Sequence, residues 1–164
     1  EALDQAKITR VSLSPGEPCR AIDGVKICVL YAPPEREEDA PVVLRLQFGG
    51  LSYLFAGDID KKDERSLQGK AGELGSAVVK VPRHGSATAS SEEFVSMVRP
   101  KLAIISAGGR FARASGRDEV LDRYRKGGAE ILRTDEDGAI IVETDGKTLR
   151  YEGYKRGKKG VISF

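Results

Sequence analysis

The sequence predicts an α/β fold with a mixed sheet and flanking helices, because its hydrophobic pattern changes along the chain. Up to residue 57, apolar and polar residues alternate with the period of two that is typical of antiparallel strands. Between residues 76 and 133, short apolar runs alternate with amphipathic helical runs, which indicates parallel strands joined by helices. With 164 residues, 40% of them hydrophobic, the chain can bury one sizeable core.

The antiparallel half is predicted to consist of strands at residues 7–13, 25–31, 42–48 and 51–57. Two of the intervening turns contain Asp23-Gly24 and Gly49-Gly50, dipeptides that accept the positive φ angles of a tight hairpin. The second half is predicted to contain helices at 60–72, 90–100 and 116–128 and strands at 76–82, 101–108, 129–134, 139–145 and 148–154. Ser90 and Glu93 have the spacing of a capping box at the start of the middle helix.

The C-terminal segment has a different composition from the rest of the chain. The stretch YKRGKKG, residues 154–160, contains four cations in seven residues, although the net charge of the whole chain is only +2. We therefore expect a folded part over residues 1–153 and a basic C-terminal tail over 154–164. Such a tail is either a solvated terminus or a contact for nucleic acid or another anionic surface. The sequence shows no membrane-spanning run and no signal peptide, and its start at Glu1 suggests that an upstream part was removed.

The only two cysteines are predicted to face each other across the first hairpin. If Asp23 and Gly24 form a two-residue turn, strand partners sum to 47, so Cys19 lies opposite Cys28. A non-hydrogen-bonded antiparallel pair has Cα atoms about 4.5 Å apart, within the range that a disulfide tolerates. We therefore predict a Cys19–Cys28 disulfide and an oxidising compartment such as the periplasm or cell exterior; two buried thiols are the alternative.

Polar residues follow two of the predicted buried strands. Asp58 comes directly after the strand at 51–57, and His84, the only histidine, follows the strand at 76–82. Functional sites of α/β proteins collect at the carboxyl ends of their strands, so these two side chains are expected to face one cleft. Each residue on its own is equally compatible with a turn cap or a polar loop.

Four stretches in this order resemble one known family: VVLRLQFGGLSYLFAGDI, VVKVPRHGSATASSEEF, RPKLAIISAGG and DEVLDRYRKGGAEILRTDEDGAIIVETDG. They resemble the C-terminal half of the metallo-β-lactamase-like domain of ComEC-type competence proteins, which form DNA-uptake channels. The resemblance implies an αββα sandwich of which this chain holds the C-terminal half. It also implies a metal-dependent phosphodiesterase or nuclease site between the two halves.

The resemblance assigns roles to individual residues. Asp58 and His84 match metal ligands and, with Lys80, are the catalytic candidates, while Lys80 and Ser86 match the positions that flank the histidines. The chain departs from the family pattern where Arg83 replaces the first histidine of a pair and where Ser115 and Arg117 replace histidines of a later loop. The HxHxDH signature is absent as well. The arginines Arg83, Arg110, Arg113 and Arg117, with Ser86, are candidates for phosphate binding instead.

Three interpretations remain open from the sequence. The chain is part of a hydrolase whose zinc or manganese site is completed by an upstream half, or a degenerate, metal-free module that contacts DNA or protein. The third interpretation gives these residues only structural roles. The first two combine in a fragment that binds no metal and is not catalytic by itself, with single-stranded DNA as a partner and an extracytoplasmic location outside the membrane. One sheet face would then pair with the upstream half, self-associate or rearrange.

Overall fold

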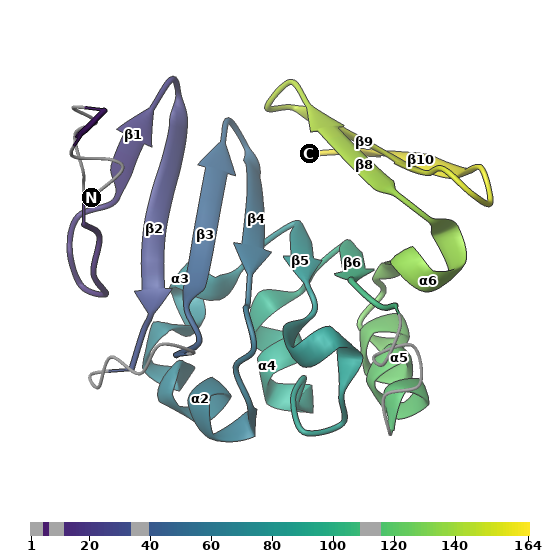
Figure 1. Ribbon diagram of the computed structural model, residues 1–164, viewed down its shortest axis with the longest axis horizontal. Helices are drawn as coiled ribbons and strands as arrows, with labels where there is room; N and C mark the ends of the chain where they lie inside the picture. Colours follow the sequence, from purple (N-terminus) through teal and green to yellow (C-terminus); the bar gives the residue numbers. More distant parts are fainter. Residues whose placement is uncertain (1–4, 7–11, 34–39, 109–115) are drawn as a thin grey trace.

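The computed structural model describes residues 5–6, 12–33, 40–108 and 116–164, and within these ranges it contains two β-sheets (Figure 1). The larger sheet has seven strands in the order β1-β2-β3-β4-β5-β6-β7, and the smaller sheet has the order β10-β9-β8. Strands β1 to β4 are antiparallel, whereas the pairs from β4 to β7 are parallel. The prediction of an α/β fold with a mixed sheet is therefore confirmed.

The strand and helix bounds are as follows. The large sheet contains β1 (Arg20–Ile22), β2 (Val25–Tyr31), β3 (Val43–Phe48), β4 (Leu51–Phe55), β5 (Val78–Lys80), β6 (Leu102–Ile105) and β7 (Glu130–Arg133). The small sheet contains β8 (Ile140–Thr144), β9 (Thr148–Gly153) and β10 (Lys158–Ser163). The helices are α2 (Lys61–Ser66), α3 (Ala71–Leu74), α4 (Glu92–Val98), α5 (Arg117–Lys126) and α6 (Thr134–Asp137), with 3-10 turns η1 (Gln68–Lys70) and η2 (Pro82–Gly85).

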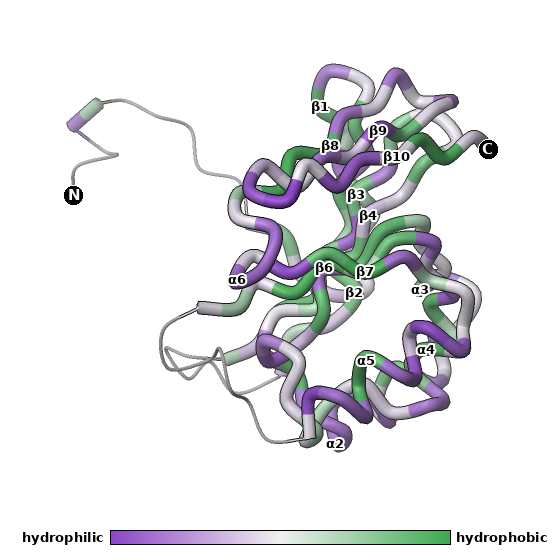
Figure 2. Tube along the Cα trace, turned by 90° about the vertical axis from the view of Figure 1, so that its right-hand side faces the viewer, coloured by the Kyte–Doolittle hydropathy of each residue, from purple (hydrophilic) through white to green (hydrophobic). Residues whose placement is uncertain are grey.

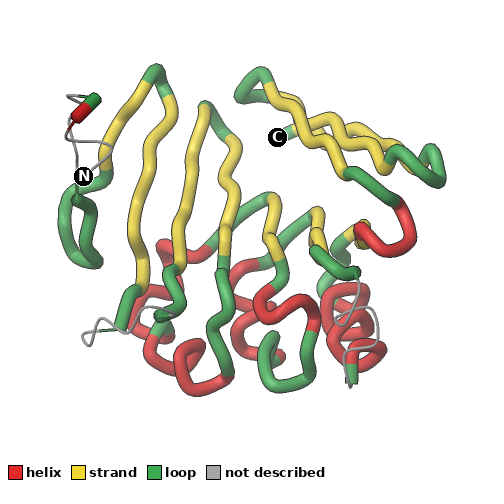
Figure 3. Tube along the Cα trace, in the orientation of Figure 1, coloured by secondary structure: helices red, strands yellow, loops and turns green. Residues whose placement is uncertain are grey.

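The two faces of the large sheet are covered by different layers. Helices α2 to α5 lie against one face, and the small sheet lies on the opposite side (Figures 2 and 3). Adjacent residues of β5 point to opposite faces: Val79 packs with Phe94 and Tyr124 on the helix side. A second core between the two sheets contains Leu51, Val78, Leu102, Leu132 and Leu149. The layers thus run helix, sheet, sheet, which is three of the four layers of an αββα sandwich.

The first hairpin has the predicted register. Arg20 pairs with Ile27 and Ile22 with Val25, and Asp23 and Gly24 both have positive φ angles in the turn. Cys19 and Cys28 form a disulfide with their Cα atoms 4.4 Å apart. The predicted disulfide is confirmed, because the turn chemistry fixes which residues oppose each other.

The small sheet leaves one part of the large sheet uncovered. The core between the sheets takes its members from β4 onward and includes no residue of β1, β2 or β3. In those strands, alternation places apolar side chains on the same face as that core. They are Ile22, Val25, Ile27, Val29, Leu44, Leu46 and Phe48. We call this set, with Phe55 of β4, the open inner face; Ile22 is 56% exposed and Phe55 is 40% exposed.

Two hairpin turns hold the small sheet against the large one. Gly50 donates its N–H to the carbonyl of Gly146 at 2.8 Å, joining the β3–β4 turn to the β8–β9 turn. A Cβ at Gly49 would lie 2.7 Å from the Cα of Gly146, so only glycine permits this approach. The Gly49-Gly50 turn, predicted as a hairpin turn, therefore also makes a contact between the sheets.

The segment expected to be a basic tail is folded, which corrects that prediction. Residues 158–163 form β10, which pairs with β9 from Lys158 opposite Gly153 to Ser163 opposite Thr148. The strand was not predicted because the segment is basic and Gly160 interrupts its apolar pattern. The ring of Tyr151 on the neighbouring strand lies where a Cβ at Gly160 would be, so the cross-strand partner of Gly160 fills this position.

The predicted helix at 60–72 and the predicted helix cap need correction, and the predicted strand at 7–13 lies only partly within the described residues. The predicted helix at 60–72 is divided into α2, η1 and α3. Helix α4 is capped by Ser91, whose side chain accepts from the N–H of Phe94, whereas Ser90 has a left-handed φ of 57° and its hydroxyl lies 3.2 Å from that of Tyr124. Of the predicted strand at 7–13, residues 7–11 lie outside the described residues and 12–13 are not in a strand.

In the ranges that the structure describes, no helix is long and apolar enough to cross a membrane.

Candidate functional site

The candidate site lies where the parallel strands end. Strands β4 and β5 are neighbours, with Phe55 opposite Lys80, so the residues that follow them emerge at the same edge. Oδ1 of Asp58 and Nε2 of His84 are 3.9 Å apart. The structure therefore brings together the carboxylate and the histidine that the sequence singled out.

The imidazole of His84 is held from the next strand. Its Nδ1 lies 2.7 Å from the carbonyl oxygen of Ser106, which follows β6. Because a carbonyl oxygen only accepts, Nδ1 carries the proton in this arrangement. Nε2 is thereby directed toward Asp58, whose side chain is 63% exposed. The nitrogen of His84 that does not contact Ser106 is therefore the one nearest the carboxylate of Asp58.

His84 belongs to a turn with left-handed backbone geometry. Arg83 and His84 have φ angles of 47° and 54°, and each such non-glycine residue costs roughly 1–2 kcal/mol. Three hydrogen bonds hold the turn: Arg83 N–H to the Gly57 carbonyl, Ser86 N–H to the Arg83 carbonyl, and Arg117 Nη2 to the His84 carbonyl. Strained backbone that is over-determined by its surroundings is typical of functional sites.

Lys80 places a positive charge beside this pair. It is the last residue of β5, on the same sheet face as Val78 and the core between the sheets. Burial lowers the pKa of its ammonium group, and the nearby carboxylate of Asp58 opposes that shift. The edge thus combines one carboxylate with a half-buried ammonium group and an imidazole.

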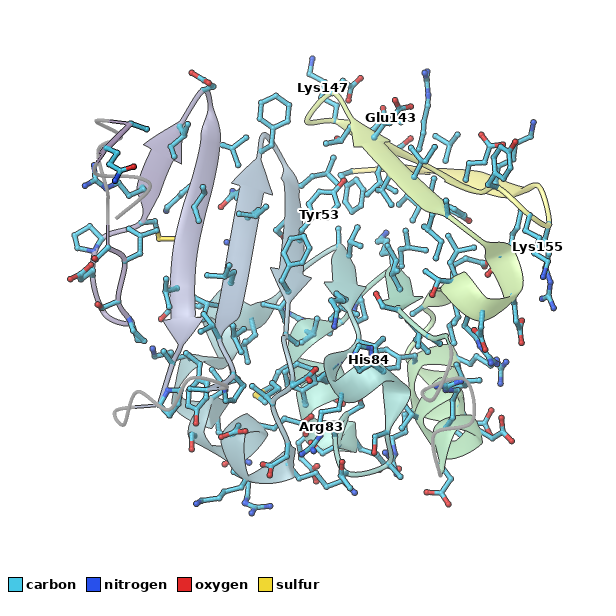
Figure 4. The ribbon with its side chains drawn as sticks, viewed as in Figure 1. Tyr53, Arg83, His84, Glu143, Lys147 and Lys155 are labelled. Carbon is cyan, nitrogen blue, oxygen red and sulfur yellow. A yellow bond between two sulfur atoms is a disulfide. The ribbon has the colours of Figure 1, made fainter. Side chains whose placement is uncertain are left out.

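Arg83 and Ser86 lie in the same turn but make other contacts. Figure 4 shows the side chain of Arg83 below His84, nearer the helices. The pKa of Asp60 is lowered chiefly by the N–H of Asp63, and the positive charge of Arg83 contributes. The hydroxyl of Ser86 lies 3.0 Å from that of Thr88. Phosphate binding by Arg83 and Ser86 stays a prediction.

Arg117 supports the histidine turn from inside the protein. Its side chain is 5% exposed, and Nη1 lies 3.6 Å from Oδ2 of Asp135. Asp135 is also bound by Arg133 at 2.7 Å, and this hydrogen bond is the main reason that the pKa of Asp135 is lowered. The contacts of Arg117 with His84 and Asp135 are internal, and a phosphate contact by this residue stays a prediction. Arg110, Arg113 and Ser115 lie outside the described residues.

The described residues do not fit a catalytic metal ion. A hydrolytic zinc ion has about three protein ligands. Nowhere in residues 5–6, 12–33, 40–108 or 116–164 do three or more His, Cys, Asp or Glu side chains form a group that could hold a metal. Asp58 and His84 supply two ligands at most, so no metal-dependent step is derived for this chain.

Two supporting residues were missed in the sequence, although a signal for them exists. Ser106 follows β6 and Asp135 follows β7, so both lie at the same strand edge as Asp58 and His84. The rule that predicted the first two positions applies equally to the next two parallel strands. Each of the four parallel strands therefore contributes at least one group to the site or its support.

A buried polar network beneath the site was also missed. The carboxylate of Glu64 accepts the N–H groups of Ser90, at 2.5 Å, and Ser91, at 2.9 Å. Arg123 donates to the carbonyl of Ser90, whose hydroxyl lies 3.2 Å from that of Tyr124. Burial raises the pKa of Glu64, although the two N–H donors oppose it. The network joins α2 to the start of α4, over a sequence distance that local patterns do not reveal.

Comparisons with known proteins give relatives of one kind. No protein-family model matches the chain. The chain is 33% identical over 107 residues to ComE operon protein 3 of Bacillus subtilis (strain 168), and 42% identical over 99 residues to Competence protein ComA of Neisseria gonorrhoeae. It is also 39% identical over 66 residues to Recombination protein 2 of Haemophilus influenzae. These segments cover 65%, 60% and 40% of this chain.

The matched segments are small parts of those relatives, covering 14%, 14% and 8% of their lengths. Among solved structures, a Thermotoga maritima protein assigned to the metallo-β-lactamase superfamily aligns with a TM-score of 0.46 and 19% identity. That alignment covers 69% of this chain and 58% of the other. The resemblance stated from the sequence motifs is confirmed by the three competence and recombination relatives over part of the chain.

Proposed function

Because this chain is homologous over part of its length to competence proteins of the ComEC family, we propose that it acts in DNA uptake as a phosphodiester-binding domain that does not hydrolyse its ligand. One observation carries this proposal. Asp58, Lys80 and His84 meet at one strand edge, where they offer cationic groups for an anion but too few ligands for a catalytic metal.

The geometry suits an anionic oxygen near Nε2 of His84. Nδ1 already donates to Ser106, so Nε2 donates a second hydrogen bond only when the ring is an imidazolium. Charge-assisted hydrogen bonds from an imidazolium and an ammonium to a phosphate are roughly twice as strong as neutral ones. Lys80 supplies the second charge.

Asp58 limits this affinity by its own negative charge. Its Oδ1 is 3.9 Å from Nε2 of His84, so the carboxylate competes with a bound phosphate for the same donor. Replacement by asparagine keeps the shape and removes the charge. Asp58→Asn should therefore bind a phosphodiester more tightly than the unmodified chain, whereas His84→Gln should bind it less tightly.

The single histidine makes a direct test possible. Since the chain contains one histidine, the imidazole resonances in an NMR spectrum belong to His84 alone. Titration with dimethyl phosphate or the dinucleotide dTpdT should shift these resonances. An Arg125→Ala variant, changed at an exposed residue of α5, serves as control. Unchanged His84 resonances at saturating dTpdT would reject the proposed site.

Hydrolysis is tested in parallel. Bis(p-nitrophenyl) phosphate and a labelled single strand are incubated with the chain and with added Zn²⁺ or Mn²⁺. We expect no turnover, because the described residues supply only Asp58 and His84 as ligands. Turnover that is lost in Asp58→Ala would instead support a competent metal site in this chain.

A second function is favoured by the orientation of His84. Metal-binding histidines usually donate their other ring N–H to a carbonyl or carboxylate, as Nδ1 does here to Ser106. In this alternative, the upstream half of the domain supplies the missing ligands of a zinc or manganese hydrolase. A longer chain that includes the upstream half should then bind metal stoichiometrically, and Asp58→Ala or His84→Ala in that chain should reduce the metal content.

The open inner face supports a partner layer. Its apolar residues include Leu46, Ile22 and Phe55, and an exposed apolar surface of this kind usually marks an interaction site. We propose that the upstream half of the same domain covers it, and that the isolated chain self-associates through it. Light scattering should show a dimer or larger species that Leu46→Glu converts to a monomer. The control is Glu143→Lys on exposed β8, and a strictly monomeric unmodified chain would contradict self-association.

The disulfide supports an extracytoplasmic location. Disulfides persist in oxidising compartments and are rare in the cytosol, so Cys19–Cys28 fits a domain outside the cytoplasmic membrane. Alkylation of intact cells before lysis should then leave both cysteines unmodified until a reductant is added. Two alkylated cysteines without reductant would place the domain in a reducing compartment.

A further inference from the structure

The hairpin of β9 and β10 carries an exposed aromatic ring next to exposed cations. Tyr154, the first residue after β9, is 79% exposed, the highest value among the exposed large hydrophobic residues of the described ranges. It is followed by Lys155 and Arg156, and Lys158 and Lys159 begin β10. Figure 4 shows Lys155 at the outer end of the hairpin. An aromatic face beside cations is the arrangement by which proteins bind single-stranded nucleic acid.

The turn of this hairpin is fixed to the rest of the protein. Tyr154 donates its N–H to the Ala139 carbonyl at 2.9 Å, and Lys155 donates to the Asp137 carbonyl at 2.7 Å. Nζ of Lys158 lies 2.6 Å from Glu130 and donates to the Ile131 carbonyl at 2.8 Å. Since these bonds hold the backbone, the ring of Tyr154 is presented from a preformed turn, which lowers the entropy lost on binding.

The cations of the hairpin divide into two groups. Arg156 is paired with Glu136 at 2.6 Å, and Lys158 is paired with Glu130, so both act within the protein. Lys155 and Lys159 are exposed, and no carboxylate of the described residues lies within ion-pair distance of either. Their charge is therefore available to a phosphate backbone beside the exposed ring, although Lys159 lies opposite the exposed carboxylate residue Glu152 on β9.

We infer that this hairpin is a contact for single-stranded nucleic acid, with an unpaired base stacked on Tyr154 and adjacent phosphates near Lys155 and Lys159. The bases of a duplex are already stacked on one another, so a single exposed ring has no base face to bind there. The inference rests on the proposed function in DNA uptake but concerns a different surface from the Asp58–His84 edge. It places the single-stranded nucleic acid on the small sheet.

The test is fluorescence anisotropy of a fluorescein-labelled 20-nucleotide oligo-dT with the complete 164-residue chain at low salt. Tyr154→Ala should weaken binding about 5- to 150-fold, whereas Tyr154→Phe, which keeps the ring, should bind within about twofold of the unmodified chain. A Lys155→Ala, Lys159→Ala double variant should reduce the slope of log affinity against log salt by about 1.4, since each lost phosphate contact contributes about 0.7. All substituted residues are exposed, and circular dichroism checks that each variant is folded.

The control is Lys62→Ala, which removes an exposed cation from α2 on the helix side. It should leave both affinity and salt slope unchanged. The inference is overturned if Tyr154→Ala binds like the unmodified chain, or if Lys62→Ala weakens binding as much as the hairpin variants do. It is also overturned if the hairpin variants lose binding to phosphatidylglycerol vesicles but keep binding to oligo-dT, because the surface would then serve a membrane.

Failure of the hairpin and failure of the proposed function give different results. If the His84 resonances respond to dTpdT while oligo-dT binding ignores the hairpin variants, the strand-edge site stands and the hairpin contact is rejected. If the hairpin variants lose oligo-dT binding while His84 never responds, the hairpin contact stands and the strand-edge site is rejected.

Discussion

The two halves of the large sheet are stabilised in different ways. The parallel half, β4 to β7, is covered by helices on one face and by β8–β10 on the other, so side chains such as Leu102 and Val79 are fully buried. The antiparallel half, β1 to β3, has helices on one face only, and a disulfide joins its outer hairpin. The candidate site lies at the edge of the half that is packed on both faces.

This difference shows why the site is on the parallel strands. The side chains of a functional site have to be held in fixed positions. Packing on both faces of the sheet fixes the backbone that carries Asp58, His84 and the residues that support them. The antiparallel half instead retains an apolar face, which suits an association surface better than a precise arrangement of polar groups.

The largest expected effect contrasts two leucines. Leu102→Ala, at a fully buried position between the sheets, should lower the free energy of unfolding by about 2–5 kcal/mol. Leu46→Ala, on the open inner face, should cost about 1 kcal/mol or less, because its side chain is already partly in water. Urea denaturation of both variants measures the contrast. An equal loss at Leu46 would show that the open inner face is packed in solution.

The next effect tests the support of the histidine turn in the parallel half. Arg117→Ala should lower stability by about 3 kcal/mol, because it removes a buried partner of Asp135 and a donor to the His84 carbonyl. Arg125→Ala, on the same helix, removes an exposed ion pair with Asp122 and should cost less than about 1 kcal/mol. Arg117→Ala should also shift the imidazole resonances of His84 without any ligand. Resonances that stay unchanged would separate Arg117 from the site.

A third prediction concerns the disulfide of the antiparallel half. A Cys19→Ser, Cys28→Ser double variant should be about 2–3 kcal/mol less stable, since the bridge closes a loop across a sequence separation of 9. Reductant should reduce the stability of the unmodified chain to that of the variant. A variant as stable as the unmodified chain in the absence of reductant would mean that the open half holds its hairpin without the bridge.

The smallest effect is at the contact between the antiparallel half and α2. The hydroxyl of Tyr31 donates to Asp63 at 2.5 Å, and this bond, with burial, raises the pKa of Tyr31 to about 12. Because the folded pKa lies above the unfolded value of 10, the stabilisation is complete below pH 10 and is lost as the pH rises through about 12.

Tyr31→Phe should therefore lower the free energy of unfolding by about 1 kcal/mol at neutral pH. It should also remove the loss of stability that deprotonation of Tyr31 causes at alkaline pH. Urea denaturation at pH values from 9 to 12 measures it, with Tyr154→Phe as the control. If Tyr31→Phe and the unmodified chain lose stability in parallel above pH 10, the Tyr31–Asp63 bond does not contribute to the loss of stability at alkaline pH.

The sequence predicted those features that depend on neighbouring residues. Asp23-Gly24 determined the register of the first hairpin and therefore the disulfide, because a two-residue turn leaves only one way to pair the strands. The positions of Asp58 and His84 followed from the ends of two apolar runs. In both cases, the interaction that decides the structure lies within a few residues of the motif.

Features that depend on distant residues were not predictable in this way. Ser91 and not Ser90 caps α4, because Ser90 has a left-handed φ of 57° and its hydroxyl contacts that of Tyr124, 34 residues away. Strand β10 exists although Gly160 interrupts its pattern, because Tyr151 fills the space from β9. Arginine is a typical phosphate ligand, but Arg117 is buried next to Asp135 and has internal partners. These outcomes depend on which elements pack together, which the local pattern does not contain.

The contact between the Gly49-Gly50 turn and Gly146 has a mechanical consequence. The small sheet is attached at two separated places, by this turn-to-turn contact and by the ion pairs of Arg156 and Lys158 at its other end. Because the small sheet is attached at both ends, neither attachment acts as a hinge about which it rotates. The surface that carries Tyr154 therefore keeps its orientation relative to the sheet edge that carries Asp58 and His84.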